Sequence, residues 1–213
     1  MAAEAHPYEP RSRFWHSSQL VGESVVIRGG CIPGIDDEEG RGDMVQKIEM
    51  FDAETRRWCE RKTKGDHHPG LSAVACASYG KHLYAYGGLD GEDLNGVLSQ
   101  LDLETLVWTQ LSPAETSDGP MRKDASGIVH FGDGMLAVVC GYAEPPNPDL
   151  PNGGSSDAGS TFIIRRGSPN YSGGGWTNEM HIFDIQSSEF QQARPKLEAG
   201  YLTLHVCLRK FRP

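Results

Sequence analysis

Two short segments carry residue types that often bind metal ions. The stretch Asp90-Gly-Glu92-Asp93-Leu-Asn95-Gly96 has the acidic composition of a calcium-binding loop. An EF-hand loop needs a ligand at its fifth position and glycine at its sixth, where this chain has Leu94 and Asn95. We therefore interpret the stretch as an acidic turn between two strands.

The second segment is the histidine pair that follows Asp66. His67 and His68 offer imidazole nitrogens, but no third ligand follows at a spacing that completes a metal site. Adjacent histidines in a turn usually face water, and we expect this of both. No Ser-His-Asp or Cys-His arrangement stands out among the eight histidines, and no glycine-rich phosphate loop precedes a helix. The sequence therefore predicts no catalytic residue, no bound metal and no cofactor.

Composition narrows the class of partner and the compartment. A formal charge of −9 disfavours nucleic acid and anionic membranes, because both reward a basic surface. No apolar run is long enough to span a bilayer, and the N-terminus has no signal-peptide pattern. The five cysteines are scattered and form no C-x-x-C pair, which favours a reducing compartment. We expect a cytoplasmic protein.

A repeated pattern runs through the chain and gives its strongest structural signal. Each unit has an apolar run ending in two small residues, a second apolar run ending in aspartate, and a large aromatic six residues later. In chain order the small pairs are Gly29-Gly30, Gly87-Gly88 and Cys140-Gly141, the aspartates are Asp52, Asp102 and Asp184, and the aromatics are Trp58, Trp108 and Phe190.

The spacing of these landmarks distinguishes a repeat from coincidence. The aspartates of the first two units are 50 residues apart, as are the tryptophans, and both intervals to the third unit are 82. One insertion, the difference of 32 residues, explains both long intervals, and the segment 143–175 is rich in proline, glycine, serine and asparagine. Because this segment cannot bury enough apolar surface to offset its ordering entropy, we expect a mobile loop.

Each unit reads as four short strands. The small pair ends the second strand, the aspartate ends the third and begins a turn, and the aromatic lies on the fourth. A large aromatic there fills the wedge between neighbouring sheets. A single four-stranded sheet cannot bury both faces, so radial stacking of the units is the natural solution.

This pattern resembles the kelch repeat over residues 11 to 194. The resemblance implies an all-β, kelch-type β-propeller built of four-stranded blades. Its units are 11–62, 63–112 and 113–194, the last with the inserted loop 143–175, between an N-terminal tail 1–10 and a C-terminal tail 195–213 with room for a single strand. Propellers have about 4 to 8 blades, so three units predict a partial propeller. We expect an open arc whose exposed end faces promote self-association.

The family resemblance also implies a function. Kelch propellers usually act as protein-interaction modules, among them substrate-recognition parts of ubiquitin ligases and cytoskeletal or scaffold proteins, and the sequence does not choose among these roles. The alternative is a propeller enzyme of the metal-dependent oxidase or specifier type. A copper oxidase of this kind needs tyrosine and histidine ligands and a cysteine cross-linked to tyrosine, and no such set stands out. We expect a binding protein and not an enzyme.

Two acidic loops are the candidate binding surface. Both lie between the second and third strands of their units, so stacking places them on the same rim. Their acidic residues are Asp36, Asp37, Glu38, Glu39 and Asp43 in the first unit and Asp90, Glu92 and Asp93 in the second. We expect a protein partner with a basic segment. The alternative interpretation is that both loops are solvated and serve solubility.

Overall fold

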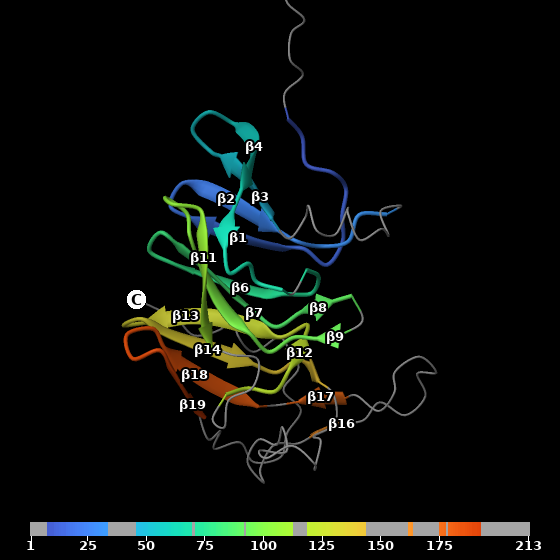
Figure 1. The fold of residues 1–213 in the computed structure, drawn as a ribbon, viewed down its shortest axis with the longest axis vertical. Helices are drawn as coiled ribbons and strands as arrows, with labels where there is room; N and C mark the ends of the chain where they lie inside the picture. The colour runs from blue at the N-terminus through green and yellow to red at the C-terminus, as the bar shows by residue number, and fades with distance from the viewer. Residues whose placement is uncertain are drawn as a thin grey trace, which may run out of the picture.

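The computed structural model describes residues 8–33, 46–69, 71–91, 93–112, 119–143, 162–163, 175–177 and 179–192. Within these ranges every regular element is a β-strand, and the sheets stack side by side (Figure 1). The same residues contain no helix of the length and apolar content needed to cross a membrane.

Three blades, each of four antiparallel strands, make up the body of the molecule, and the second belongs to a sheet with a fifth, parallel strand. Blade 1 consists of β1 (Ser17–Val21), β2 (Ser24–Arg28), β3 (Lys47–Asp52) and β4 (Arg57–Lys62). Blade 2 consists of β6 (Ala75–Tyr79), β7 (His82–Tyr86), β10 (Leu98–Asp102) and β11 (Val107–Ser112). Blade 3 consists of β13 (Gly127–Gly132), β14 (Met135–Val139), β18 (Met180–Asp184) and β19 (Glu189–Gln192). The predicted all-β fold of three stacked blades in an open arc is confirmed.

The aspartate that ends each third strand builds the turn into the fourth. Asp52 Oδ1 accepts hydrogen bonds from the backbone amides of Glu54 and Thr55, at 2.9 and 2.8 Å. These bonds favour the ionised carboxylate, and the bond from the Thr55 amide is the main reason that the pKa of Asp52 lies below its usual value. Arg56 then adopts a left-handed conformation, with φ at 55°. Asp102 and Asp184 accept the equivalent bonds in blades 2 and 3.

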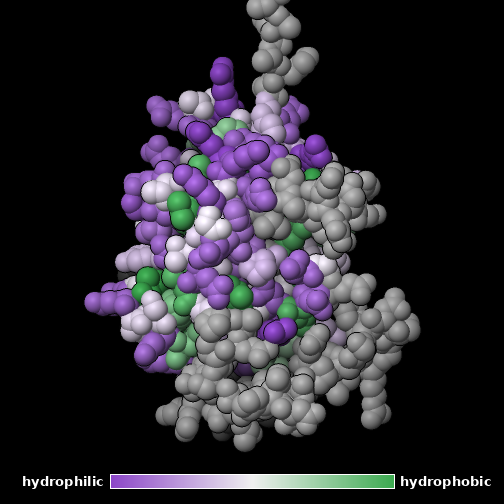
Figure 2. All heavy atoms as spheres, viewed as in Figure 1, coloured by the Kyte–Doolittle hydropathy of each residue, from purple (hydrophilic) through white to green (hydrophobic). Residues whose placement is uncertain are grey.

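Two apolar clusters hold the blades together, one in each gap. The cluster between blades 1 and 2 consists of Val21, Val26, Ile48, Val74, Cys76, Leu83, Ala85, Leu101 and Trp108. The cluster between blades 2 and 3 consists of Ala77, Tyr84, Tyr86, Leu98, Leu136, Val138 and Phe183, with Phe190 packed against it. The core is therefore a series of layers between sheets. In the view of Figure 2 the outer surface is mostly hydrophilic, with hydrophobic residues in small separate groups.

Several shorter strands lie beside the blades. β5 (Lys64–Gly65) pairs in parallel with β11, and β8 (Leu89–Asp90) forms a hairpin with β9 (Asp93–Leu94). A small sheet joins β12 (Lys123–Asp124), β15 (Tyr142–Ala143), β17 (Gly175–Thr177) and β16 (Phe162–Ile163).

The sequence led us to expect a loop over the whole inserted segment 143–175, but the structure has short strands in it. Ala143 pairs with Gly175 at its two ends, and Ile163 pairs with Trp176. The backbone hydrogen bonds of these short strands offset part of the entropy lost on ordering, although the segment has little apolar surface to bury. Residues 144–161 and 164–174, like the C-terminal tail 195–213, lie outside the described residues.

Candidate functional site

The second strands of the three blades end at the same end of the arc, on the right in Figure 1. This end carries the β8–β9 hairpin and the small sheet of β12, β15, β17 and β16, whereas the tight turns lie at the opposite end. Of the predicted acidic rim, Asp90 and Asp93 face each other in the hairpin, and both are exposed. The other six rim residues lie outside the described ranges: Asp36, Asp37, Glu38, Glu39, Asp43 and Glu92.

Backbone hydrogen bonds hold this hairpin against the linker that enters blade 2. The amide of Leu71 donates to the Leu89 carbonyl at 2.8 Å, and the Leu89 amide donates to the Ser72 carbonyl at 2.8 Å. Asn95, just after the hairpin, accepts the Val97 amide on Oδ1 at 2.7 Å. The backbone beneath Asp90 and Asp93 is thus held by hydrogen bonds. The Asn95 side chain stabilises the turn that follows the hairpin. Within the described ranges no three His, Cys, Asp or Glu side chains gather closely enough to hold a metal ion.

The glycine pairs let neighbouring blades approach at this end. A Cβ on Gly87, whose φ is 68°, would lie 2.3 Å from the Lys123 carbonyl oxygen, so any other residue would force the neighbouring backbone to shift. Gly88 then donates its amide to that carbonyl at 2.9 Å. The junction of blades 1 and 2 repeats this arrangement with Gly29, Gly30 and Leu71. The glycine pair therefore joins each blade to the next.

A buried polar contact fixes the linker into blade 2. His68 is fully buried, and its Nε2 lies 2.9 Å from the Gly87 carbonyl, which can only accept, so Nε2 carries the proton. Nδ1 then accepts from the Ser99 hydroxyl at 3.1 Å. Burial and the neighbouring Arg28 guanidinium lower the pKa of His68 to about 3, so the ring is neutral. The expectation that both histidines face water is wrong for His68, because its ring closes this junction.

Arg28 completes the same junction from blade 1. Its guanidinium is buried, donates to the His68 carbonyl oxygen at 2.6 Å and lies 5.2 Å from the centre of the Trp108 ring. This geometry is a cation–π contact. The aromatic landmark of blade 2 therefore packs against blade 1, as its place on the fourth strand requires.

Blade 3 has a charged counterpart of this contact. Lys123 is fully buried, and its ammonium group is paired with Glu179 Oε1, which also accepts the Met121 amide at 2.9 Å. His181 Nε2 lies 3.4 Å from the other carboxylate oxygen. Burial alone raises the pKa of Glu179, but the His181 hydrogen bond and the Lys123 charge outweigh it and lower the pKa to about 2. The ion pair therefore joins the linker that enters blade 3 to the start of its third strand.

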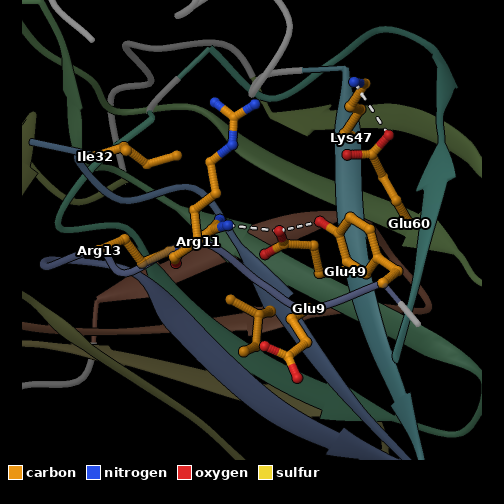
Figure 3. A pocket seen from close by; sticks show the side chains of 9 residues that line it. Glu9, Arg11, Arg13, Ile32, Lys47, Glu49 and Glu60 are labelled. Atoms are coloured by element: carbon orange, nitrogen blue, oxygen red, sulfur yellow. Dashed lines mark hydrogen bonds and ion pairs between the residues drawn. The ribbon is translucent and has the colours of Figure 1, made fainter. Parts of the chain in front are cut away.

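Blade 1 carries the third polar contact, beside a pocket on its open face (Figure 3). Glu49 Oε1 accepts from Tyr8 Oη and from Arg13 Nη2, each at 2.5 Å, and Arg13 Nη1 donates to the Gly29 carbonyl at 3.2 Å. The pocket holds about 120 Å³ and is lined largely by charged side chains, including Lys47 and Glu60, which pair at 3.1 Å. The charges balance, so the pocket has no strong preference for either sign.

Sequence reasoning missed all three polar contacts. Each blade uses a different linker residue, Arg13, His68 or Lys123, so the repeat gives no common signal. One signal was available: a polar residue, Glu49, Ser99 or His181, stands at the corresponding position of each third strand.

An open array of four-stranded blades, joined by glycine pairs and carrying its loops at one end, defines a β-propeller repeat domain. The chain belongs to the kelch-repeat family: residues 2–141 match the family model described as the KLHDC2/KLHL20/DRC7 Kelch-repeats domain. Kelch-repeat domains generally mediate protein interactions.

Several kelch proteins are similar in sequence. Kelch domain-containing protein 10 of Rattus norvegicus is 31% identical over 135 residues, which cover 63% of this chain and 31% of that protein. Kelch domain-containing protein 3 of Homo sapiens is 24% identical over 195 residues, covering 83% of this chain and 48% of that protein. The chain thus spans between about a third and a half of the length of these relatives.

Proposed function

We propose that this chain is a protein-interaction module that binds a partner at the end of the arc that carries the second-to-third-strand loops. The observation that carries the proposal is the β8–β9 hairpin, which presents Asp90 and Asp93 to solvent from a base fixed by hydrogen bonds to Leu71 and Ser72. A rigid acidic projection suits a basic segment, because little entropy is lost when the partner binds.

Family membership supports binding rather than catalysis, since kelch-domain relatives are typically non-enzymatic interaction modules. Within that class we propose an adaptor or scaffold role, with substrate recognition for a ubiquitin ligase as one form of it. The cytoplasm is the compartment we propose, because Cys31, Cys59 and Cys76 are free thiols and a reducing environment suits them. We also propose that copies of the chain associate through the open faces of their end blades.

A charge-neutralising variant tests the loop-binding proposal. Asp90→Asn with Asp93→Asn removes the acidic pair, and the matched control is Glu54→Gln with Asp133→Asn, which neutralises exposed turn residues at the opposite end. Affinity capture from cytosolic extract, read by quantitative mass spectrometry at two salt concentrations, is the measurement. We expect proteins that the unmodified chain and the control retain at low salt to be lost with the hairpin variant. Identical protein sets for both variants would exclude the hairpin as the binding surface.

A further inference from the structure

Blade 1 exposes the same face that blade 2 buries. Four positions correspond strand by strand in the two blades: Val25, Ile27, Phe51 and Trp58 in blade 1 match Leu83, Ala85, Leu101 and Trp108 in blade 2. The blade 2 set is at most 1% exposed beneath blade 1, whereas all four blade 1 residues are only partly buried. Leu20, on the same face of β1, is 63% exposed. This face has the composition of a blade junction and lacks a described blade to cover it.

The pocket of Figure 3 lies on this same face. Arg13 bridges the Gly29 carbonyl and Glu49 in the way that His68 bridges the Gly87 carbonyl and Ser99 in blade 2. In blade 2 the neighbouring blade covers this contact. In blade 1 the corresponding place is the open pocket of about 120 Å³. The pocket therefore corresponds to the edge of a blade junction.

The outer face of blade 3 has the complementary composition. Ile128 and His130 face blade 2, so by alternation Val129 faces outward, and it is 46% exposed. Phe131 lies at the bulge between His130 and Gly132, and its side chain is 45% exposed. Ala137, Met180 and Ile182 belong to the same outward face, at positions that match Val26, Ile48 and Met50 of blade 1. Those three blade 1 residues belong to or pack against the cluster that covers blade 2.

We propose that two copies of the chain associate head to tail, with blade 3 of one copy packed on blade 1 of the other. Such an interface is heterologous, and two of them related by a two-fold axis close a ring of six blades, which is within the usual range of propellers. This inference rests on the proposed self-association and adds its polarity and register. The occupant is a second copy because the chain itself carries both halves of the junction.

The internal junctions specify the register. The Ala73 amide donates to the Trp15 carbonyl at 2.9 Å, and the Ala125 amide donates to the Ala73 carbonyl at 3.2 Å. Continued between copies, the pattern directs the Trp15 amide of one copy to the Ala125 carbonyl of the other. The stacked pair Tyr79–His130, with ring centroids 4.1 Å apart, joins blades 2 and 3. Its counterpart between copies is Phe131 against Leu20.

Cys140 weakens this junction. A Cβ on the first glycine of blade 1 or blade 2 would lie 2.0 or 2.3 Å from the carbonyl oxygen of the next blade. Cys140 stands at that position in blade 3, in the same left-handed conformation with φ at 54°. In the proposed register its Cβ meets the Arg13 carbonyl of the second copy. Cys140→Gly should therefore tighten the association by roughly ten- to a hundredfold, as expected when an overpacked contact is relieved.

Sedimentation velocity over a range of concentrations tests the proposal with two single variants, Leu20→Glu and Phe131→Glu. Both side chains are exposed in the single chain, so neither variant should disturb folding. The matched control is Trp176→Glu, which removes a side chain that is 42% exposed and lies on neither blade face. We expect dimers from the unmodified chain and the control, and monomers from each single variant. An equimolar mixture of the two variants should recover a dimer, because one junction then joins two intact faces.

The outcomes separate the two proposals. A chain that is monomeric at every concentration overturns both self-association and its polarity. If the unmodified chain dimerises and one of the two single variants still dimerises like it, like faces pair with like and the head-to-tail arrangement is wrong. A Cys140→Gly variant whose dimer dissociates as readily as the unmodified one overturns the register.

Discussion

Trp108 should contribute more to stability than its counterpart in blade 1, although both are repeat landmarks. Its ring is 1% exposed, lies between blades 1 and 2, and carries the Arg28 guanidinium on its face. A buried tryptophan removes on the order of 200 Å² from water, which at about 25 cal/mol per Å² is about 5 kcal/mol. Measured losses for replacing a buried tryptophan by alanine are roughly 3 to 5 kcal/mol. We therefore expect Trp108→Ala to lower the free energy of unfolding by about 4 kcal/mol.

The matched control is Trp58→Ala on the open face of blade 1. Trp58 contacts Phe51 at 5.1 Å between ring centroids but has no described blade over it, so we expect a loss of roughly 2 kcal/mol. Urea denaturation followed by far-ultraviolet circular dichroism gives both values, at a concentration low enough to keep the chain monomeric. Equal losses for the two variants would refute the assignment of Trp108 to a blade junction.

Four further outcomes are expected. Gly87→Ala should cost more than Gly80→Ala by about 1 to 3 kcal/mol, because both glycines are left-handed but only Gly87 faces a carbonyl oxygen at 2.3 Å; thermal unfolding compares them. Lys123→Met should lower the free energy of unfolding by about 3 to 5 kcal/mol, since it leaves the Glu179 carboxylate buried without its cation, and urea denaturation measures the loss. The folded-state pKa of Glu179 is about 2, below its ordinary 4.5, so its stabilisation should persist above pH 4.5 and disappear as the pH falls toward 2, which acid titration of stability checks. Limited proteolysis should cut first within 144–174, and early cleavage near the turn after β10 would contradict the assignment of units two and three.

The blades are predictable from sequence because the landmark residues are the types that the local backbone conformation requires. Gly87 is needed where a carbonyl of the next blade approaches within the space of a side chain, and Asp102 is needed to satisfy two turn amides. Such demands recur in every unit at fixed spacing, so they remain visible in a single sequence. Cys140 departs from the pattern, yet its backbone keeps the left-handed conformation that glycine has at this position in the other two blades.

The polar contacts are less accessible because they depend on pairs far apart in the chain. His68 meets Ser99 across 31 residues, and Lys123 meets Glu179 across 56, with the inserted segment between them. Neither pair has a spacing that a repeat fixes. The small sheet around Phe162–Ile163 escapes prediction for the same reason, since strands of two or three residues carry no periodicity. The acidic rim follows from loop placement, but its outcome as a binding surface stays a prediction.

The layered core makes stability depend on position along the array. Within the described chain, blade 2 alone has a neighbouring blade against each face, since one apolar cluster lies on either side of it. Each end blade can detach at the cost of a single cluster, whereas opening blade 2 requires the loss of both. Amide hydrogen exchange should therefore be slowest in β7 and β10, at the centre of blade 2. Exchange should quicken outward toward β4 and β19, so the chain unravels from its ends while its middle sheet persists.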